Sequence, residues 1–502
     1  MTERRATALG QLRNRFSTIS DLYSAKNLLI WDQQTYMPEG SSAGRAEQMA
    51  TLSRLAHEML TDVKMGRLLD SLGEPDPSSE EGALVRRLGR DYQRARKMPT
   101  ELVARITRTT ALAKQAWVKA RRESDWSFFA PHLAQILLLK REAAESLGYD
   151  DHPYDALLED YEPGARKVQL ERMFGELKAG IVPLVRAVEG CAGKNQSALL
   201  RGTFDETKQE EFGRSVVTDF GYDWERGRQD RSVHPFCITF GPGDVRITTR
   251  FDRGWLAPAL FSTMHEAGHA LYEQGVNPAY TRTPLGSGTS MGVHESQSRL
   301  WENLVGRSRA FWSHYWPKLQ QTFPEALGRA DSETFYGAIN ALEPSEIRVE
   351  ADEVTYNLHI LLRFELEIAL FEDNLPVTEL PYAWNAKMEE YLGLQPENDS
   401  SGVLQDIHWA DGLFGYFPTY AIGNVLSVQL FDEAVRANPE VPEEIAHGEF
   451  ASLLGWLREN IHRHGSRYYP DELVEKATGR PLDTGPYLSY LKDKFGQLYD
   501  LT

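Results

Sequence analysis

Two histidines and a glutamate occur together at a spacing that suits a metal site. The segment His265–His269 reads His-Glu-Ala-Gly-His, so its two histidines are four residues apart. On an α-helix this spacing brings both imidazoles to one face, with Glu266 beside them, which is typical of a catalytic zinc site. The alternative is a surface helix with two solvated histidines, because a five-residue match also arises by chance.

Glu295 is the candidate for the third metal ligand. Zinc hydrolases that take two histidines from one helix draw the third ligand from a separate segment. Here the glycine-rich stretch Pro284–Gly292 leads into a helical pattern that contains Glu295, and a helix-loop-helix turn would bring this carboxylate to face His265 and His269. The alternative is ordinary placement of a carboxylate in the first turn of a helix. Arg299 stands where an aspartate partner for a ligand histidine is expected, so the orienting residues must lie elsewhere.

Three protein ligands leave one position on the metal for a water molecule. Zinc lowers the pKa of its bound water to about 7, so a hydroxide-like nucleophile exists at neutral pH. Glu266 points away from the face that carries the ligands, which makes it the candidate general base. It would take the proton of the water and return it to the leaving amine. These residues predict the hydrolysis of an amide bond.

A helix and a hairpin must position these residues. Apolar residues at helical spacing predict a helix around His265–His269, with Gly275 as its C-cap. These apolar residues are Leu256, Leu260, Phe261, Met264 and Leu271. Before it, residues 234–240 and 244–250 alternate in period two around Gly241–Asp244, which predicts a β-hairpin that would wall a substrate cleft.

Three polar residues share one face of the second hairpin strand. Asp244, Arg246 and Thr248 recur at a spacing of two, so their side chains point to the same side. We expect an ion pair and hydrogen bonds among them that brace the cleft, in preference to a direct catalytic role.

Five motifs occur along the chain in one order. They are Asp244–Thr248, His265–His269, His294–Gln297, Ile347–Asp352 and Gly402–Trp409. Together they resemble the Taq-type thermostable metallocarboxypeptidases, zinc exopeptidases that remove single residues from free peptide C-termini. The resemblance spans essentially the whole chain without a departure at any motif position. It implies one zinc ion per chain, which another divalent metal such as cobalt can replace, peptide substrates with free C-termini, and a homodimer.

Arg348 is the candidate that recognises the end of the substrate. A planar guanidinium can bind both oxygens of a terminal carboxylate, and the resemblance points to the motif that contains Arg348. The alternative is a structural arginine paired with Glu350 or Asp352, which the residues alone would favour.

The last motif and the aromatic residues after it can supply hydrogen-bond donors. Attack on an amide creates an oxyanion, which fixed O–H or N–H donors stabilise. His408 and Tyr420 are the candidates for this role, and Tyr416 is a further candidate that would contact the substrate. The alternative for the aromatic residues is core packing, because apolar neighbours surround them, namely Trp409, Phe414 and Phe417.

Helical patterns extend over most of the 502 residues. Successive amphipathic helices fill about residues 5–200, for example Leu133–Leu147, which ends near Gly148. Further helical patterns cover Glu443–Ile461 and Tyr487–Tyr499. We therefore expect a mainly α fold with a small β region near the active site, similar to the elongated, groove-bearing helical zinc peptidases.

The motifs must converge on one site, and no low-complexity linker divides the chain. We therefore expect a single catalytic unit over residues 1–502. Its N-terminal helices, about 1–200, would cover the cleft, and the catalytic part would occupy about 201–502.

Composition excludes some partners and favours a compartment. A net charge of −18 argues against nucleic acid, which needs a basic face. No apolar run approaches the ~20 residues of a membrane span, and the N-terminus lacks an apolar export signal. The two cysteines, Cys191 and Cys237, fit a reducing cytoplasm, with Cys237 a small packed residue.

Two other functions share some of these features. An endo-acting zinc oligopeptidase would use the same metal site, with a structural Arg348. A non-catalytic helical scaffold could hold a metal, but a structural zinc needs no base such as Glu266 and closes its fourth position.

Overall fold

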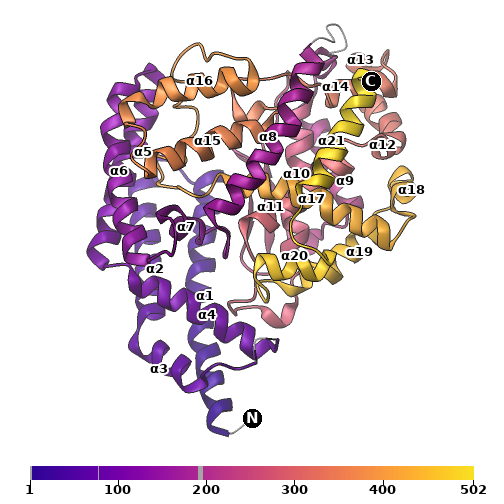
Figure 1. Ribbon diagram of the computed structural model, residues 1–502. Helices are drawn as coiled ribbons and strands as arrows, with labels where there is room; N and C mark the ends of the chain where they lie inside the picture. Colours follow the sequence, from indigo (N-terminus) through magenta and orange to yellow (C-terminus); the bar gives the residue numbers. More distant parts are fainter. Residues whose placement is uncertain (1–2, 77, 190–195, 502) are drawn as a thin grey trace. The chain divides into compact units, whose positions relative to one another are not determined.

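A computed structural model describes residues 3–76, 78–189 and 196–501 (Figure 1). Most of these residues are α-helical and one small sheet accompanies them, which confirms the mainly α fold. The chain folds into two compact units. The first consists of residues 1–96, 197–339 and 427–482, and the second of 97–196, 340–426 and 483–502. Each unit thus combines N-terminal, central and C-terminal segments.

Helices make up most of the described chain. In order they are α1 (Glu3–Thr35), α2 (Ser42–Thr61), α3 (Val63–Leu72), α4 (Glu80–Lys97), α5 (Thr100–Glu123), α6 (Trp126–Leu147), α7 (Pro153–Leu158), α8 (Lys167–Glu189), α9 (Glu206–Asp219), α10 (Leu256–Gly275), α11 (Met291–Arg299), α12 (Arg309–Thr322), α13 (Pro324–Leu327), α14 (Ser332–Ile339), α15 (Tyr356–Phe371), α16 (Leu380–Leu392), α17 (Pro418–Ala437), α18 (Val441–Ala446), α19 (Ala451–Asn460), α20 (Pro470–Thr478) and α21 (Thr484–Tyr499).

The sheet contains three strands and belongs to the first unit. Strand β2 (Cys237–Thr239) runs antiparallel to β3 (Val245–Thr249), with Cys237 opposite Ile247, which confirms the predicted hairpin. Strand β1 (Gln229–Arg231) pairs in parallel with the other edge of β3, so the order is β1-β3-β2. Strand β1 was not predicted from the sequence, because three residues are too few to show a period.

Helix α10 carries the His265–His269 motif and packs against this sheet. Thr263 on α10 and Thr249 on β3 are both buried, and their hydroxyl oxygens are hydrogen-bonded at 2.9 Å. The predicted apolar residues of α10 lie in the core. The predicted C-cap is wrong by one residue, since Gly275 is the last helical residue and Val276 follows it. Gly275 is needed for space, because a Cβ there would lie 2.6 Å from the Cβ of His462.

The other helical patterns are confirmed with one change. Leu133–Leu147 lies within α6, which ends before Gly148, and Tyr487–Tyr499 lies within α21. The pattern at Glu443–Ile461 forms two helices, α18 and α19, instead of one. The chain turns between them at Gly448, whose φ of +78° is a left-handed conformation that favours glycine.

Two composition features can be placed on this fold. Among the described residues, none of the helices is both long and apolar enough to cross a membrane. Cys237 is a free, half-buried thiol in β2, whereas Cys191 lies outside the described residues.

Candidate metal centre

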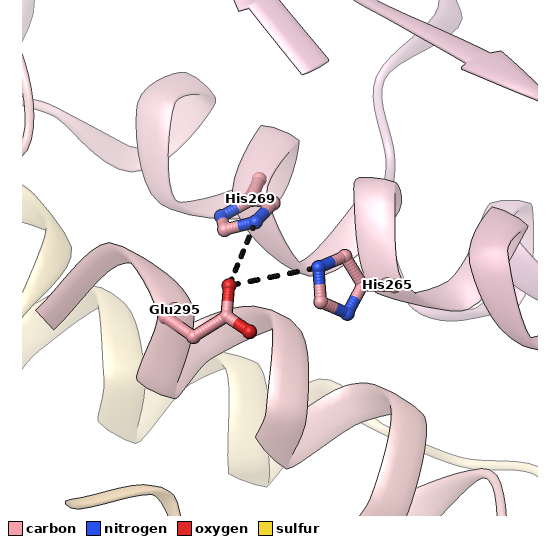
Figure 2. A group of neighbouring side chains, drawn as sticks. All are labelled: His265, His269 and Glu295. Carbon is pink, nitrogen blue, oxygen red and sulfur yellow. Dashed lines mark ion pairs between the residues drawn. The ribbon is translucent and has the colours of Figure 1, made fainter. Parts of the chain in front are cut away.

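The three predicted metal ligands converge on one point in the first unit (Figure 2). The Nε2 atoms of His265 and His269 lie 3.6 Å and 3.5 Å from the same oxygen, Oε2 of Glu295. His265 and His269 come from α10, whereas Glu295 comes from α11, whose first turn is capped by the Ser290 hydroxyl. The predicted helix-loop-helix therefore brings the carboxylate to the two imidazoles.

The spacing of these donor atoms fits a zinc ion. Tetrahedral zinc with ligand bonds of ~2.0–2.1 Å separates neighbouring ligand atoms by ~3.4 Å. The two nitrogen–oxygen distances are within about 0.2 Å of that separation, and all three donor atoms lie within 4.8 Å of one another. Two imidazoles and one carboxylate are also a donor set that zinc hydrolases use.

Two neighbouring side chains orient the imidazoles. The Nδ1 atom of His265 lies 2.9 Å from Oε2 of Glu302, and Nδ1 of His269 lies 2.7 Å from Nδ1 of His294. Both contacts occupy Nδ1, so each Nε2 is turned toward Glu295, where it could bind a metal ion. The expectation that Arg299 does not orient a histidine is confirmed, since its Nε donates instead to Oε1 of Glu295 at 2.8 Å.

The Glu302 side chain reaches the site from an unusual turn. Residues Leu300–Val305 form a π-helix directly after α11, where the sequence predicted a continuing α-helical pattern. The wider turn changes which residues face α10, and single π turns are frequent at functional sites. Glu302 is buried there with the neighbouring Trp301.

The charges around the site favour a cation. Burial opposes ionisation of Glu295, but Arg299 and the two ligand histidines lower the pKa of Glu295 below its ordinary value. Burial likewise opposes ionisation of Glu302, yet Arg299 and His265 lower the pKa of Glu302 to about 2. Burial lowers the pKa of His269 to about 4, so this imidazole is neutral near pH 7. Neutral imidazole and ionised carboxylate are the forms that bind metal.

Glu266 lies beside the ligands without joining them. Its side chain is 7% exposed, and burial raises the pKa of Glu266 to about 7, against an opposing effect of the neighbouring His265. A carboxylate of this kind can accept and return a proton near neutral pH, which suits a general base.

Gly268 allows the two ligand helices to approach closely. A Cβ at this position would lie 2.6 Å from both the carbonyl oxygen of Gln297 and the Cα of Ser298, on α11. Glycine inside a helix lowers the stability of the helix by about 1 kcal/mol relative to alanine, so Gly268 is explained by packing and not by helix propensity. The close approach of α10 to the α11 backbone supplies that reason.

Replacing Gly268 with alanine is expected to weaken zinc binding by about ten-fold or more. Carbon atoms in contact need ~3.5–4.0 Å, so the added methyl group must move α11 by roughly 1 Å. That shift would carry Glu295 away from the histidines, and metal sites tolerate only about 0.2 Å. Zinc titration of metal-free protein measures the change. Gly455→Ala is the control, since α19 leaves open space there, and equal affinities of the two variants would contradict the packing account.

Arg348 lies in the second unit, in a short 3₁₀ turn, Arg348–Glu350. Its Nη2 donates to Oδ1 of Asp406 at 2.8 Å, and its Nη1 donates to the hydroxyl of Tyr356 at 2.9 Å. Its ion-pair partner is therefore Asp406 rather than Glu350 or Asp352. The same carboxylate also accepts from Arg363, a residue that sequence reasoning did not single out.

Gln405 links the fifth motif to the fourth, and Asp352 fixes the end of the fourth motif. Asp352 accepts from the backbone N–H groups of Val354 (2.9 Å) and Thr355 (3.0 Å) just before α15 begins. The Oε1 atom of Gln405 accepts from the backbone N–H of Arg348 and from Nη2 of Arg363, each at 2.8 Å. These contacts brace the turn that presents Arg348.

His408 and Tyr420 lie together in the second unit. Nε2 of His408 is 3.4 Å from the hydroxyl of Tyr420. The ring centroid of Tyr416 lies 5.5 Å from the ring centroids of both His408 and Tyr420, so the three candidates form one cluster. Burial lowers the pKa of His408 to about 4, so its imidazole is neutral near pH 7. Core packing is the alternative for Tyr416 and Tyr420. Their apolar neighbours Trp409, Phe414 and Phe417 are buried, whereas Tyr416 and Tyr420 are themselves half-buried.

A buried glutamate that sequence reasoning missed anchors the loop after His408. Glu367 on α15 accepts from the hydroxyl of Tyr154 (2.6 Å), the indole N–H of Trp409 (2.8 Å) and the backbone N–H of Gly415 (3.1 Å). The signal present in the sequence was a charged residue inside the apolar pattern of α15, as it was for Arg363. Such residues rarely stay buried unless they are paired.

The Asp244–Thr248 motif forms the predicted ion pair. Arg246 donates through Nε and Nη2 to the two carboxylate oxygens of Asp244, at 2.9 Å and 2.8 Å. The hydroxyl of Thr248 is hydrogen-bonded to Ser232 at 2.7 Å and accepts from the backbone N–H of Phe236 at 3.0 Å. The predicted ion pair is therefore confirmed, and Thr248 forms these hydrogen bonds with residues outside the motif.

Comparisons with known proteins agree with this site and fold. Residues 11–495 match the family described as carboxypeptidase Taq (M32) metallopeptidase. The chain is 44% identical to thermostable carboxypeptidase 1 of Thermus thermophilus, over 95% of this chain and 96% of the relative. It is 39% identical to carboxypeptidase 1 of Bacillus subtilis, over 96% of each. The crystal structure of the M32 carboxypeptidase from Deinococcus radiodurans R1 superposes with a TM-score of 0.96 at 43% identity, covering 99% of this chain and 100% of that one. The chain therefore belongs to the carboxypeptidase Taq (M32) family, and it is a metallocarboxypeptidase as its five motifs predicted.

Proposed function

We propose that this metallocarboxypeptidase holds one zinc ion on His265, His269 and Glu295 and uses Glu266 as the general base. The observation that carries the proposal is the convergence of the three donor atoms at separations that suit tetrahedral zinc. A bound zinc ion would supply a Lewis acid that makes water nucleophilic at neutral pH. The same donors accept other divalent metals, such as cobalt.

The other candidate residues of the motifs are proposed to carry out the remaining steps. Glu266 takes the proton from the attacking water and returns it to the nitrogen of the leaving amino acid, so the amide bond breaks without a free proton. His408, neutral as a result of burial, and Tyr420 donate hydrogen bonds to the oxyanion that attack creates. Tyr416 contacts the substrate beside them.

Arg348 is proposed to bind the terminal carboxylate of the peptide. Among the described residues, the carboxylate of Asp406 is the only one in ion-pair distance of Arg348 and Arg363. One carboxylate between two guanidinium groups leaves a positive charge unbalanced, and burial makes that imbalance costly. A substrate carboxylate would neutralise it, which favours peptides with a free C-terminus over internal peptide bonds.

Arg348→Ala is expected to lower kcat/KM on free-acid peptides by ten-fold to over a hundred-fold. A charge-assisted contact with a carboxylate is worth about 1.5–3 kcal/mol, and the variant loses it. C-terminally amidated peptides, which are poor substrates already, should lose little more. The measurement is the ratio of kcat/KM on a free-acid peptide to kcat/KM on the matched amidated peptide, for the wild type and the variant.

Arg363→Lys provides the control for this ratio. Arg363 is fully buried and contacts the same carboxylate of Asp406, so its replacement disturbs the cluster without removing a group that can touch substrate. It should lower activity on both peptide classes alike. The same equal loss in Arg348→Ala would make Arg348 structural and favour an endo-acting peptidase.

The resemblance of the motifs also supports a homodimer as the working form, and the cysteine content supports a cytoplasmic location. The two cysteines in 502 residues are consistent with a reducing compartment. Sedimentation of the purified protein measures the assembly directly, and a monomer at working concentrations would remove this part of the proposal.

A further inference from the structure

Glu273 extends the row of metal ligands along α10. It follows His269 by four residues, as His269 follows His265, so the three side chains lie on one face of the helix. Glu273 is only 3% exposed, and it lies outside all five sequence motifs. A carboxylate seldom remains buried in a helix unless specific partners hold it.

Both hydrogen-bond partners of Glu273 are connected to the proposed metal ligands. Its Oε1 atom lies 2.9 Å from Nε2 of His294 and accepts from the backbone N–H of Gly288 at 3.0 Å. The other ring nitrogen of His294, Nδ1, lies 2.7 Å from Nδ1 of His269. A continuous chain of hydrogen bonds therefore runs from Glu273 through His294 to His269.

Metal binding at Nε2 of His269 and an ionised Glu273 require the same proton positions in this chain of hydrogen bonds. A histidine that binds metal through Nε2 in its neutral form carries its proton on Nδ1, so His269 must donate to His294. Nδ1 of His294 then accepts, which leaves the proton of His294 on Nε2. That N–H donates to Glu273, an acceptor-only group when ionised.

The hydrogen bond from Gly288 to Glu273 holds the loop before α11 in place. A Cβ at Gly288 would lie 2.8 Å from Cδ2 of His294 and from Cε1 of Tyr272, so the backbone at Gly288 packs closely against these two side chains. The backbone N–H of the next residue, Thr289, donates to the hydroxyl of Tyr272 at 3.2 Å. Helix α11, which carries Glu295, starts two residues later.

We propose that Glu273 is a positioning residue for the metal site. Through His294 it holds His269 in the tautomer and ring orientation that expose Nε2 to the metal, and through Gly288 it fixes the start of the helix that carries Glu295. This inference rests on the proposed zinc site. It assigns a shared task to two residues, Glu273 and His294, that are not themselves ligands.

Zinc affinity of Glu273 variants tests the proposal. Glu273→Leu removes the acceptor, and its zinc dissociation constant should rise by about 10- to 100-fold, as is typical for residues that orient ligands. Glu273→Gln keeps an oxygen that can accept from both partners, so its affinity should remain within several-fold of wild type. Thr263→Val is the matched control, because Thr263 is also buried and hydrogen-bonded on α10 but faces β3. Competition with a chromophoric chelator on metal-free protein gives each constant.

Nitrogen NMR of the wild-type protein with labelled histidine gives a second readout that needs no variant. His269 should carry its proton on Nδ1 and His294 on Nε2, in the zinc-loaded protein. The reverse tautomer of His294, wild-type affinity in Glu273→Leu, or an equal loss in Thr263→Val would each overturn the inference. A wild-type protein that binds no zinc would instead overturn the zinc proposal, and this inference would fall with it.

Discussion

Replacing Glu266 with glutamine is expected to lower turnover by roughly 10² or more while zinc content stays unchanged. The amide keeps the shape of the side chain but cannot take a proton from the attacking water. Glu266 is not among the three residues whose donor atoms converge, so the variant leaves the ligand set intact. Turnover at saturating free-acid peptide and zinc analysis of the same sample measure both quantities.

A buried acid elsewhere in the first unit controls for the loss of charge. Glu433 on α17 is 8% exposed, pairs with Arg436 and lies outside every motif. Glu433→Gln should keep near-normal turnover. If Glu266→Gln also kept it, the base would have to be another residue and the assignment of Glu266 would be wrong.

Removing any one metal ligand should produce the second large effect. Alanine at His265, His269 or Glu295 is expected to weaken zinc binding by about 10³-fold or more, because each ligand contributes several of the ~10–16 kcal/mol typical of a three- or four-ligand zinc site. Peptide hydrolysis should fall to background in all three variants. Zinc titration and activity with added zinc measure these losses.

The fold should survive these substitutions, because α10 and α11 belong to a core that buries many apolar residues without metal. Circular dichroism and thermal unfolding of the metal-free variants test this point. An alanine variant that bound zinc as tightly as wild type would remove that residue from the ligand set. Unfolding of all three would indicate a structural metal instead of a catalytic one.

The metal ligands could be predicted from the sequence because their geometry is local. Two histidines four residues apart share a helix face whatever surrounds the helix, and the loop before Glu295 is short enough to return the next helix. The contact that orients His265 could not be predicted in the same way. It depends on a π turn at Leu300–Val305 that moves Glu302 into the site, and no period in the sequence marks that turn.

The residues that were missed or misplaced have roles that depend on contacts made only in the folded chain. Gly275 looked like a helix cap, yet its packing against His462 is what requires glycine. Strand β1 pairs in parallel with β3, but its three residues are too few to show a period in the sequence. Arg363 and Glu367 are charged residues in an apolar helix, and their partners include Asp406 and Trp409 from the loop after residue 404. Glu273 repeated the four-residue spacing of the ligands, a signal that was present and unused.

Stoichiometric restoration of activity by zinc tests the central claim most directly. Protein treated with a chelator and then freed of it should contain no metal and hydrolyse no peptide. Activity on a free-acid peptide should rise in proportion to added zinc and reach its plateau at one zinc per chain, with no plateau of this kind in Glu295→Ala. Full activity of the metal-free wild-type protein would contradict the account.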